Sequence, residues 1–312
     1  MAIYVQTNVS SLQGRNALRN IQTSLTTTYQ RLSTGMRINS AKDDAAGLQI
    51  ANRLTSQING LNQGNRNASD GIALAQTIEG GLDEITAMLQ RGRTLAVQSA
   101  TGTNTVDDRE AINKELRSIQ EEIHRIGTQT TYGGKAILKG FGVGDTLYGE
   151  QSQNLVDFKG DPINGGRMTL QVGANSGDTI VFEVADFSWS GLVSNALGTT
   201  TGLGQGVGAG GTFVDIETAE QASQAIEDFD VLISYVDAQR ADLGAIQNRL
   251  ESSIRNQSNI AANESDARAR IRDADFAEES ANLAQQTIIQ QAAASMLMQA
   301  NARPQLALSL LG

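Results

Sequence analysis

Apolar side chains recur along most of this 312-residue chain at alternating spacings of three and four residues. Such spacing places them on one face of an α-helix and, when it is sustained, builds the seam of a coiled coil. The pattern runs through residues 18–32, 51–89, 112–126 and 222–254. It predicts a mainly α-helical protein whose long helices pack side by side through these seams.

The first two helices carry recognisable signals at their ends. Gly35 is typical of the left-handed residue that follows the last turn of a helix. Ser40 and Asp43 have the spacing of a capping box, which predicts that a second helix starts at Ser40. Its seam runs to residue 89, and a helix over residues 45–99 would be roughly 80 Å long at about 1.5 Å per residue.

Similar signals mark the helices that follow. Tyr132-Gly133-Gly134 is expected to end the third helix, because glycine stops helices. Thr218 and Gln221 repeat the capping-box spacing where the last long seam begins. Arg240 and Gln247 occupy positions within that seam, where polar residues fix the register of packed helices at some cost in stability.

Both ends of the chain lack an ordinary charged face. Residues 280–302 contain no Asp, Glu, Lys or Arg, and residues 1–40 contain four Arg but no acidic residue. A helix without a charged face is expected to be surrounded by other protein. Ordering it in a free monomer costs conformational entropy, so we expect 280–302 to be largely disordered there. The predicted self-assembly core consists of Leu18, Ile21, Leu25, Leu32, Ala284, Ile288 and Ala292.

The middle of the chain has a different character. Residues 168–172 and 179–184 alternate or are β-branched, and the GANSG segment between them predicts the turn of a β-hairpin. Residues 188–216 are rich in Gly, Ser and Thr and are interpreted as a loop.

The simplest arrangement folds the C-terminal half back along the N-terminal half. It gives an elongated antiparallel helical bundle, a rod, with the small β subdomain inserted in the middle and both termini at one end. The expected domains are discontinuous. They comprise 1–40 with 276–312 as a terminal coiled coil, 41–187 with 217–275 as helical bundle plus hairpin, and 188–216 as an outward loop.

Composition narrows the function classes. The formal net charge of −10 disfavours a nucleic-acid partner. No stretch has the apolar length of a membrane span, so we expect no membrane insertion. The N-terminal residues lack the basic and apolar regions of a secretory signal peptide, which predicts export, if any, by another route.

Few residues in the sequence could form a catalytic, nucleotide-binding or metal-binding site. Counting alone leaves open a Ser–His–Asp triad through the single histidine, His124, but no G-x-S-x-G motif accompanies it. The G-x-G-x-x-G match at 206–211 lacks the flanking strand and helix of a nucleotide site. Met296 and Met298 are interpreted as packing residues rather than metal ligands. We therefore expect a protein that is not an enzyme and has no cofactor or metal.

Several segments together resemble bacterial flagellin, the subunit of the flagellar filament. The most specific is LSTGMRINSAKDDAAGL at 32–48. It is accompanied, in the order of that family, by GIALAQT at 71–77, LGAIQNRL at 243–250 and RIRDADFA at 270–277. The resemblance covers about 1–140 and 168–312.

The resemblance implies a function and a set of partners. Flagellins self-assemble into the extracellular filament used for swimming motility, with their paired termini in the filament core and the central insert facing outward. It implies export of the unfolded subunit through the flagellar type III channel, without a cleaved signal peptide. It also implies a cytoplasmic export chaperone, a filament cap and hook–filament junction proteins as partners. The 188–216 segment leaves no room for a large outer domain.

Two further sets of site residues follow. The resemblance implies that Arg91, Leu95 and Glu115 are contacts for a vertebrate Toll-like receptor, although Gly92 and Thr94 depart from the family pattern. We interpret the three as an interface between neighbouring subunits. Candidate O-glycosylation positions, with a plain flexible loop as the alternative, are Ser188, Ser190, Ser194, Thr199, Thr200 and Thr201.

Two other functions remain alternatives to the filament subunit. One is a minor hook–filament junction protein, which abundance in sheared filaments would separate from the main subunit. The other is a secreted helical adhesin or binding module that uses residues 141–212, which would bind its ligand without either terminus.

Overall fold

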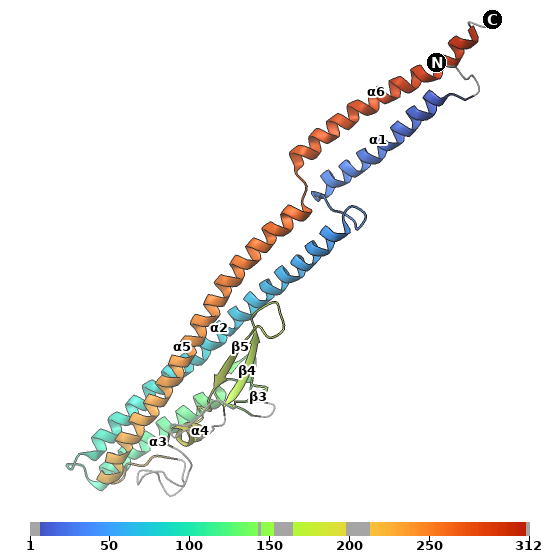
Figure 1. The fold of residues 1–312 in the computed structure, drawn as a ribbon. Helices are drawn as coiled ribbons and strands as arrows, with labels where there is room; N and C mark the ends of the chain where they lie inside the picture. Colours follow the sequence, from blue (N-terminus) through green and yellow to red (C-terminus); the bar gives the residue numbers. More distant parts are fainter. Residues whose placement is uncertain (1–6, 143–144, 153–164, 198–212, 310–312) are drawn as a thin grey trace. The chain divides into compact units, whose positions relative to one another are not determined.

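The computed structural model describes residues 7–142, 145–152, 165–197 and 213–309. The protein is mainly α-helical with a small antiparallel β subdomain, as predicted (Figure 1). The helices are α1 (Val9–Thr34), α2 (Ala45–Ala100), α3 (Val106–Gln129), α4 (Trp189–Leu197), α5 (Ala219–Arg272) and α6 (Phe276–Ser309). The strands are β1 (Thr131–Tyr132), β2 (Lys135–Ala136), β3 (Glu150–Gln151), β4 (Gly166–Gln171) and β5 (Thr179–Val184).

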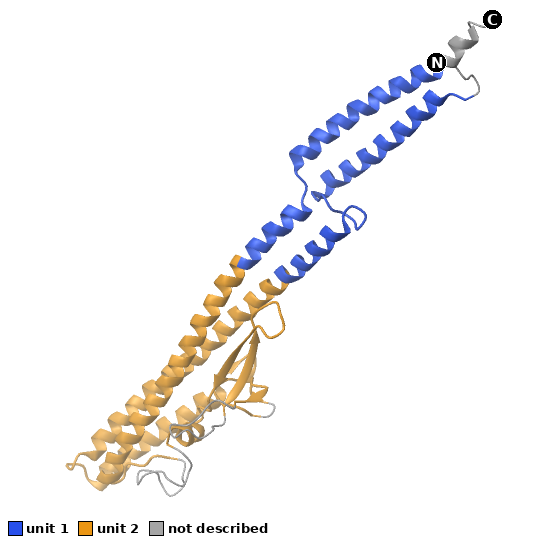
Figure 2. Cartoon of the chain, viewed as in Figure 1, with its two compact units in different colours: residues 1–58, 260–312 blue, residues 59–259 orange. Residues whose placement is uncertain are grey.

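The chain forms two compact units (Figure 2). Unit 1 comprises residues 1–58 and 260–312, and unit 2 comprises residues 59–259. The boundaries therefore fall within α2 and α5, whereas the sequence placed them at 40/41 and 275/276. Unit 1 contains the first turns of α2 and the last turns of α5, and neither helix is interrupted at the boundary.

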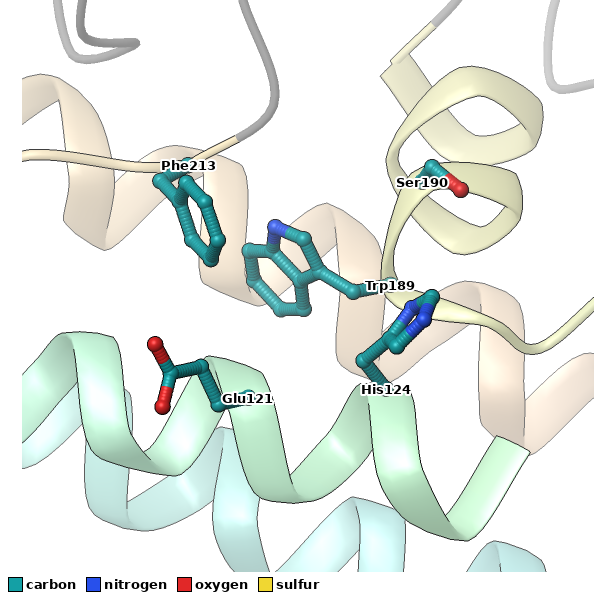
Figure 3. Close-up of a pocket in the computed structure, with 5 residues that line it drawn as sticks. All are labelled: Glu121, His124, Trp189, Ser190 and Phe213. Atoms are coloured by element: carbon teal, nitrogen blue, oxygen red, sulfur yellow. The ribbon is translucent and has the colours of Figure 1, made fainter. Parts of the chain in front are cut away.

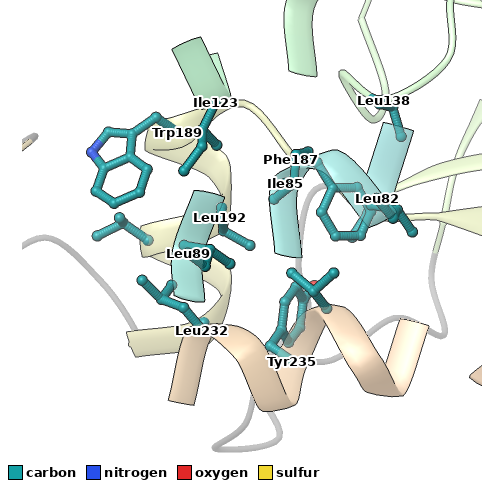
Figure 4. Close-up of a cluster of buried hydrophobic side chains, with 14 of the residues drawn as sticks. Leu82, Ile85, Leu89, Ile123, Leu138, Phe187, Trp189, Leu192, Leu232 and Tyr235 are labelled. Carbon is teal, nitrogen blue, oxygen red and sulfur yellow. The ribbon is translucent and has the colours of Figure 1, made fainter. Parts of the chain in front are cut away.

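Unit 2 contains most of the hydrophobic core. Its helices α2, α3 and α5 meet through the predicted seams, and Leu82, Ile85 and Leu89 of α2 are fully buried. Ile123 of α3 and Leu232 of α5 join the same cluster (Figure 4). Burial of one such side chain stabilises the fold by about 1.5–3 kcal/mol, so this seam supplies much of the stability of unit 2.

The polar seam residues of α5 find partners on α2. The Nη2 atom of Arg240 lies 2.5 Å from Oδ1 of Asp83, and the side-chain amide of Gln247 donates a 3.0 Å hydrogen bond to Glu79. These pairs form only when α5 is in one register along α2. The contacts support the interpretation that the two residues fix register.

The β4–β5 hairpin, which the sequence predicted, lies against a row of glycines on α2. A Cβ atom on Gly60 would come within 2.8 Å of the Ala174 side chain, and one on Gly64 would overlap the carbonyl of Val172. Asn67, between them and Gly71, donates from its amide to the Gln171 carbonyl at 2.8 Å. The missing side chains let the hairpin backbone approach the helix directly.

Helix α2 begins at Ala45, so the predicted start at Ser40 is wrong. The Asp43 carboxylate accepts the backbone N–H groups of Ser40 and Asn39 and closes a turn before the helix. Those N–H groups lower the pKa of Asp43. Asp44 provides the cap, since its Oδ1 accepts the Gly47 N–H at 2.9 Å.

Two further expectations are corrected. Helix α3 ends at Gln129, and Gly133 and Gly134 form the turn of the β1–β2 hairpin with φ angles of 59° and 81°. The loop predicted at 188–216 is wrong over α4, where apolar residues three and four apart bury one side of a short helix. Residues 198–212 lie outside the described residues.

Two glycines of α2 test the close approach of the hairpin. Gly64→Ala should lower the free energy of unfolding by about 1–3 kcal/mol, because its Cβ overlaps backbone that must move. Gly80 has nothing within 4 Å of a built Cβ, so Gly80→Ala should raise it by about 0.5–1 kcal/mol through helix propensity. Urea unfolding followed by circular dichroism measures both, and equal effects of the same sign would contradict the packing described.

Candidate assembly surface

Unit 1 pairs α1 with α6 in antiparallel orientation. At one end, Asn8 caps α1 by accepting the Ser11 N–H, and its amide donates to the Ala300 carbonyl of α6 at 2.8 Å. At the other end, Gly35 adopts a φ of 68°, and its carbonyl accepts the Ala274 N–H at 3.0 Å. Backbone hydrogen bonds therefore join the segments that follow α1 and precede α6, and the Asn8 side chain ties the opposite ends together.

The side of α6 that packs on α1 is a heptad seam. Its members are buried or half-buried and follow spacings of four and three residues. They are Glu279, Leu283, Gln286, Gln290, Ala293, Leu297 and Ala300. A Cβ on Gly14 of α1 would lie 3.1 Å from the Cδ1 atom of Leu297, which shows how closely the helices approach. Glu279 is 7% exposed, and its Oε1 lies 3.5 Å from Nη1 of Arg31.

The predicted self-assembly core contains residues that the α1–α6 pairing covers and residues that it leaves exposed. In α1, Leu25 is buried and Leu18, Ile21 and Leu32 are half-buried, as a seam requires. In α6, the members of the predicted self-assembly core are exposed and lie outside the seam that faces α1. They are Ala284, Ile288 and Ala292. Ala and other apolar residues occur around the whole of α6, so spacing alone does not show which side of this helix meets α1.

Unit 1 also carries most of the exposed large apolar side chains in the described part of the chain. They are Val9, Leu12, Tyr29, Ile50, Ile260, Phe276, Ile288, Ile289, Met296 and Met298. In unit 2 the corresponding residues are Val97 and Val106. An exposed apolar surface of this kind marks a site of association with protein or membrane. We call the exposed side of α6 over residues 284–298 the outer face.

The outer face differs from an ordinary helix surface in charge as well. It belongs to the segment 280–302, which has no charged residue. Covering it with protein therefore desolvates no ionised group of its own, which removes the largest cost of burial. In the described residues, no helix is both long and apolar enough to cross a membrane.

Arg91, Leu95 and Glu115 lie in unit 2 and do not form one surface. The guanidinium of Arg91 on α2 contacts the Glu115 carboxylate on α3, with Nη2 and Oε1 2.7 Å apart and both side chains exposed. Leu95 is 1% exposed and belongs to the core, which corrects its prediction as a surface contact. Gly92 accommodates the ring of Phe229, from which a Cβ would be only 2.9 Å away.

The candidate O-glycosylation residues differ in how exposed they are. Ser188 is buried, and its hydroxyl accepts the Gly191 N–H at the start of α4, so it is a capping residue and not an outward-facing acceptor. Ser190 is exposed and Ser194 is half-buried. Thr199, Thr200 and Thr201 lie outside the described residues. Burial raises the pKa of the Asp186 carboxyl, which accepts a hydrogen bond from the Ser188 N–H. That hydrogen bond lowers the pKa and so opposes the effect of burial.

A small recess of about 190 Å³ lies beside α4 (Figure 3). Glu121 and exposed His124 come from α3, Trp189 and Ser190 from α4, and Phe213 from the segment before α5. The recess is smaller than the cavities that usually hold cofactors. In the described ranges, no cluster of three or more His, Asp or Glu residues could hold a metal ion.

Comparisons with known proteins agree with the helices just described. The family model for the bacterial flagellin N-terminal helical region matches residues 5–142, and that for the C-terminal helical region matches 226–311. Flagellin A of Vibrio cholerae is 39% identical, and polar flagellin C of Vibrio parahaemolyticus is 34% identical. Both comparisons cover 100% of each chain, and the first spans 378 aligned positions against the 312 residues here.

A solved structure shares the fold. A putative flagellar hook-associated protein from Vibrio parahaemolyticus superposes with a TM-score of 0.53 and 15% identity. The match covers 74% of this chain and 100% of that one, and it bears on the fold alone. The family models and the full-length relatives carry the assignment. This chain belongs to the bacterial flagellin family and is a structural subunit of the flagellar filament.

Proposed function

We propose that the subunits polymerise through the outer face of α6, with α1 and α6 together forming the core of the filament. The observation that carries this proposal is the exposure of Ile288, 66%, on a helix segment without a charged residue. A lone subunit leaves this apolar surface in water. Neighbouring copies that cover it gain about 25 cal/mol for each Å² of apolar surface buried.

The terminal helices then have two separate contact sets. Leu18, Ile21, Leu25 and Leu32 pack within the subunit, where α1 meets α6. Ala284, Ile288 and Ala292 lie on the outer face, where neighbouring subunits would meet them. The burial of these residues in the single chain supports this division of the predicted assembly residues between two partners.

For export and delivery, the support is membership of the flagellin family. We infer that the chain leaves the cell through the flagellar type III channel without a cleaved signal peptide and is added to the extracellular filament under a cap. Before export, a chaperone that covers the outer face would prevent premature association, because exposed apolar patches of this kind aggregate. Hook–filament junction proteins would meet the same helices at the base of the filament.

The ion pair between Arg91 and Glu115 suits a contact between subunits. An exposed pair contributes only about 0–1 kcal/mol to the subunit itself, so its two charges are available to a partner. We propose that partner to be a neighbouring subunit. A Toll-like receptor contact would have to use these two residues without buried Leu95.

We infer a main filament subunit rather than the hook–filament junction protein that the sequence left open, because the full-length relatives are flagellins. Quantitative mass spectrometry of sheared filaments separates the two functions. A main filament subunit should dominate the preparation, whereas a junction protein would be a trace component.

Substitution on the outer face tests the assembly proposal. Ile288→Asp should raise the critical concentration for polymerisation by at least about tenfold, because an unpaired charge would be buried between subunits. Sedimentation of filaments grown from purified subunits measures it. Ile288→Leu controls for the position, and Val106→Asp places the same charge on an exposed residue of unit 2. Normal polymerisation of Ile288→Asp, or of a chain lacking residues 280–312, would contradict the proposal.

A further inference from the structure

The methionines of this protein are unequally exposed. Of six in the chain, Met296 and Met298 on α6 are each 69% exposed. Met36, Met88 and Met168 are half-buried, and Met1 lies outside the described residues. Oxidation of a thioether requires access to the sulfur atom. The two most accessible methionine side chains in the described ranges therefore lie two residues apart on the outer face.

Their placement on α6 explains this exposure. Leu297, between them, turns toward α1 and approaches Gly14. Adjacent residues on a helix are about 100° apart around its axis, so Met296 and Met298 flank the α1–α6 seam on either side. Neither side chain is covered by α1, and both belong to the charge-free segment 280–302.

We propose that Met296 and Met298 are an oxidation site that controls polymerisation: peroxide oxidises them in the free subunit, and the oxidised subunit is excluded from the filament. This inference rests on the proposed role of the outer face in assembly. In each step the sulfur attacks one peroxide oxygen, an S–O bond forms and the O–O bond breaks. The thioether is oxidised to a sulfoxide, and hydrogen peroxide is reduced to water.

The effect on assembly follows from the change in polarity. A thioether is apolar and adapts its shape to a neighbouring surface. A sulfoxide carries a strong hydrogen-bond acceptor, which loses its water when another subunit covers it. The 280–302 segment offers no cationic donor, so the oxygen is poorly compensated. We expect the critical concentration to rise at least about tenfold, as for other unpaired polar groups in an interface.

Assembly should protect the two methionines from oxidation. Once neighbouring subunits cover the outer face, peroxide no longer reaches the two sulfur atoms. Filaments should therefore resist the same treatment that inactivates free subunits. Because methionine sulfoxide is reduced by sulfoxide reductases, the block should be reversible.

The experiment uses the purified full-length chain and hydrogen peroxide. Free subunits and finished filaments are treated in parallel, the sulfoxides are mapped by peptide mass spectrometry, and polymerisation is measured by sedimentation. In free subunits, Met296 and Met298 should oxidise before Met88 and Met168, and polymerisation should then require at least about tenfold more protein. In filaments, both should remain reduced. Treatment with a methionine sulfoxide reductase should restore polymerisation.

Two variants show which methionines cause the loss of polymerisation after peroxide treatment. Each variant is compared with its own untreated sample. Met296→Leu/Met298→Leu should lose the sensitivity to peroxide, whereas Met88→Leu/Met168→Leu should retain it. Equal sensitivity of the two variants, unmodified Met296 and Met298 in free subunits, or normal polymerisation of oxidised subunits would overturn the inference. If the untreated chain failed to polymerise, the proposed assembly function would fall and this inference with it. Normal untreated assembly with no effect of oxidation would overturn the inference alone.

Discussion

Helix α6 has more apolar surface than its one partner in the chain can cover. Its inner side packs on α1 through the seam that includes Leu283 and Leu297, and its outer face remains in water. Two paired helices bury too little surface to offset the entropy of ordering them. The charge-free sequence between 280 and 302 makes a further layer of protein the natural cover. Unit 1 therefore leaves apolar surface of α6 in water, and polymerisation would cover it.

The described part of unit 2 buries most of its own large apolar side chains. Its helices bury a continuous cluster that includes Ile85, Leu89 and Leu116, and the glycine row on α2 brings the β4–β5 hairpin within backbone contact. Pairs such as Arg240 with Asp83 restrict α5 to one register. Unit 2 can therefore fold as a stable body before assembly. Both units are built from paired long helices. They differ in how much of their apolar surface the chain itself buries.

The long seams of α2, α3 and α5 could be predicted from spacing, because most large apolar residues of each helix lie on its buried side. The contact side of α6 could not, since Ala, Ile, Leu and Met surround that helix and periodicity ranks its sides equally. Helix α4 was missed because its five apolar residues lie among Ser, Gly and Asn residues. Leu95 was misplaced because a family resemblance supplies a residue's identity without its burial. The glycine row was visible at spacings of four and seven, at Gly60, Gly64 and Gly71, but only the hairpin's position explains it.

Amide hydrogen exchange of α6, in free subunits and in filaments, tests the account most directly. Exchange reports the free energy of local opening, and a helix with one covered side opens at low cost. We expect rapid exchange over residues 280–302 in the free subunit, slow exchange there in the filament, and slow exchange in the α2 core of unit 2 in both. Protection of 280–302 in the free subunit equal to that of the unit 2 core would show that α6 is stable without neighbours, and would contradict the account.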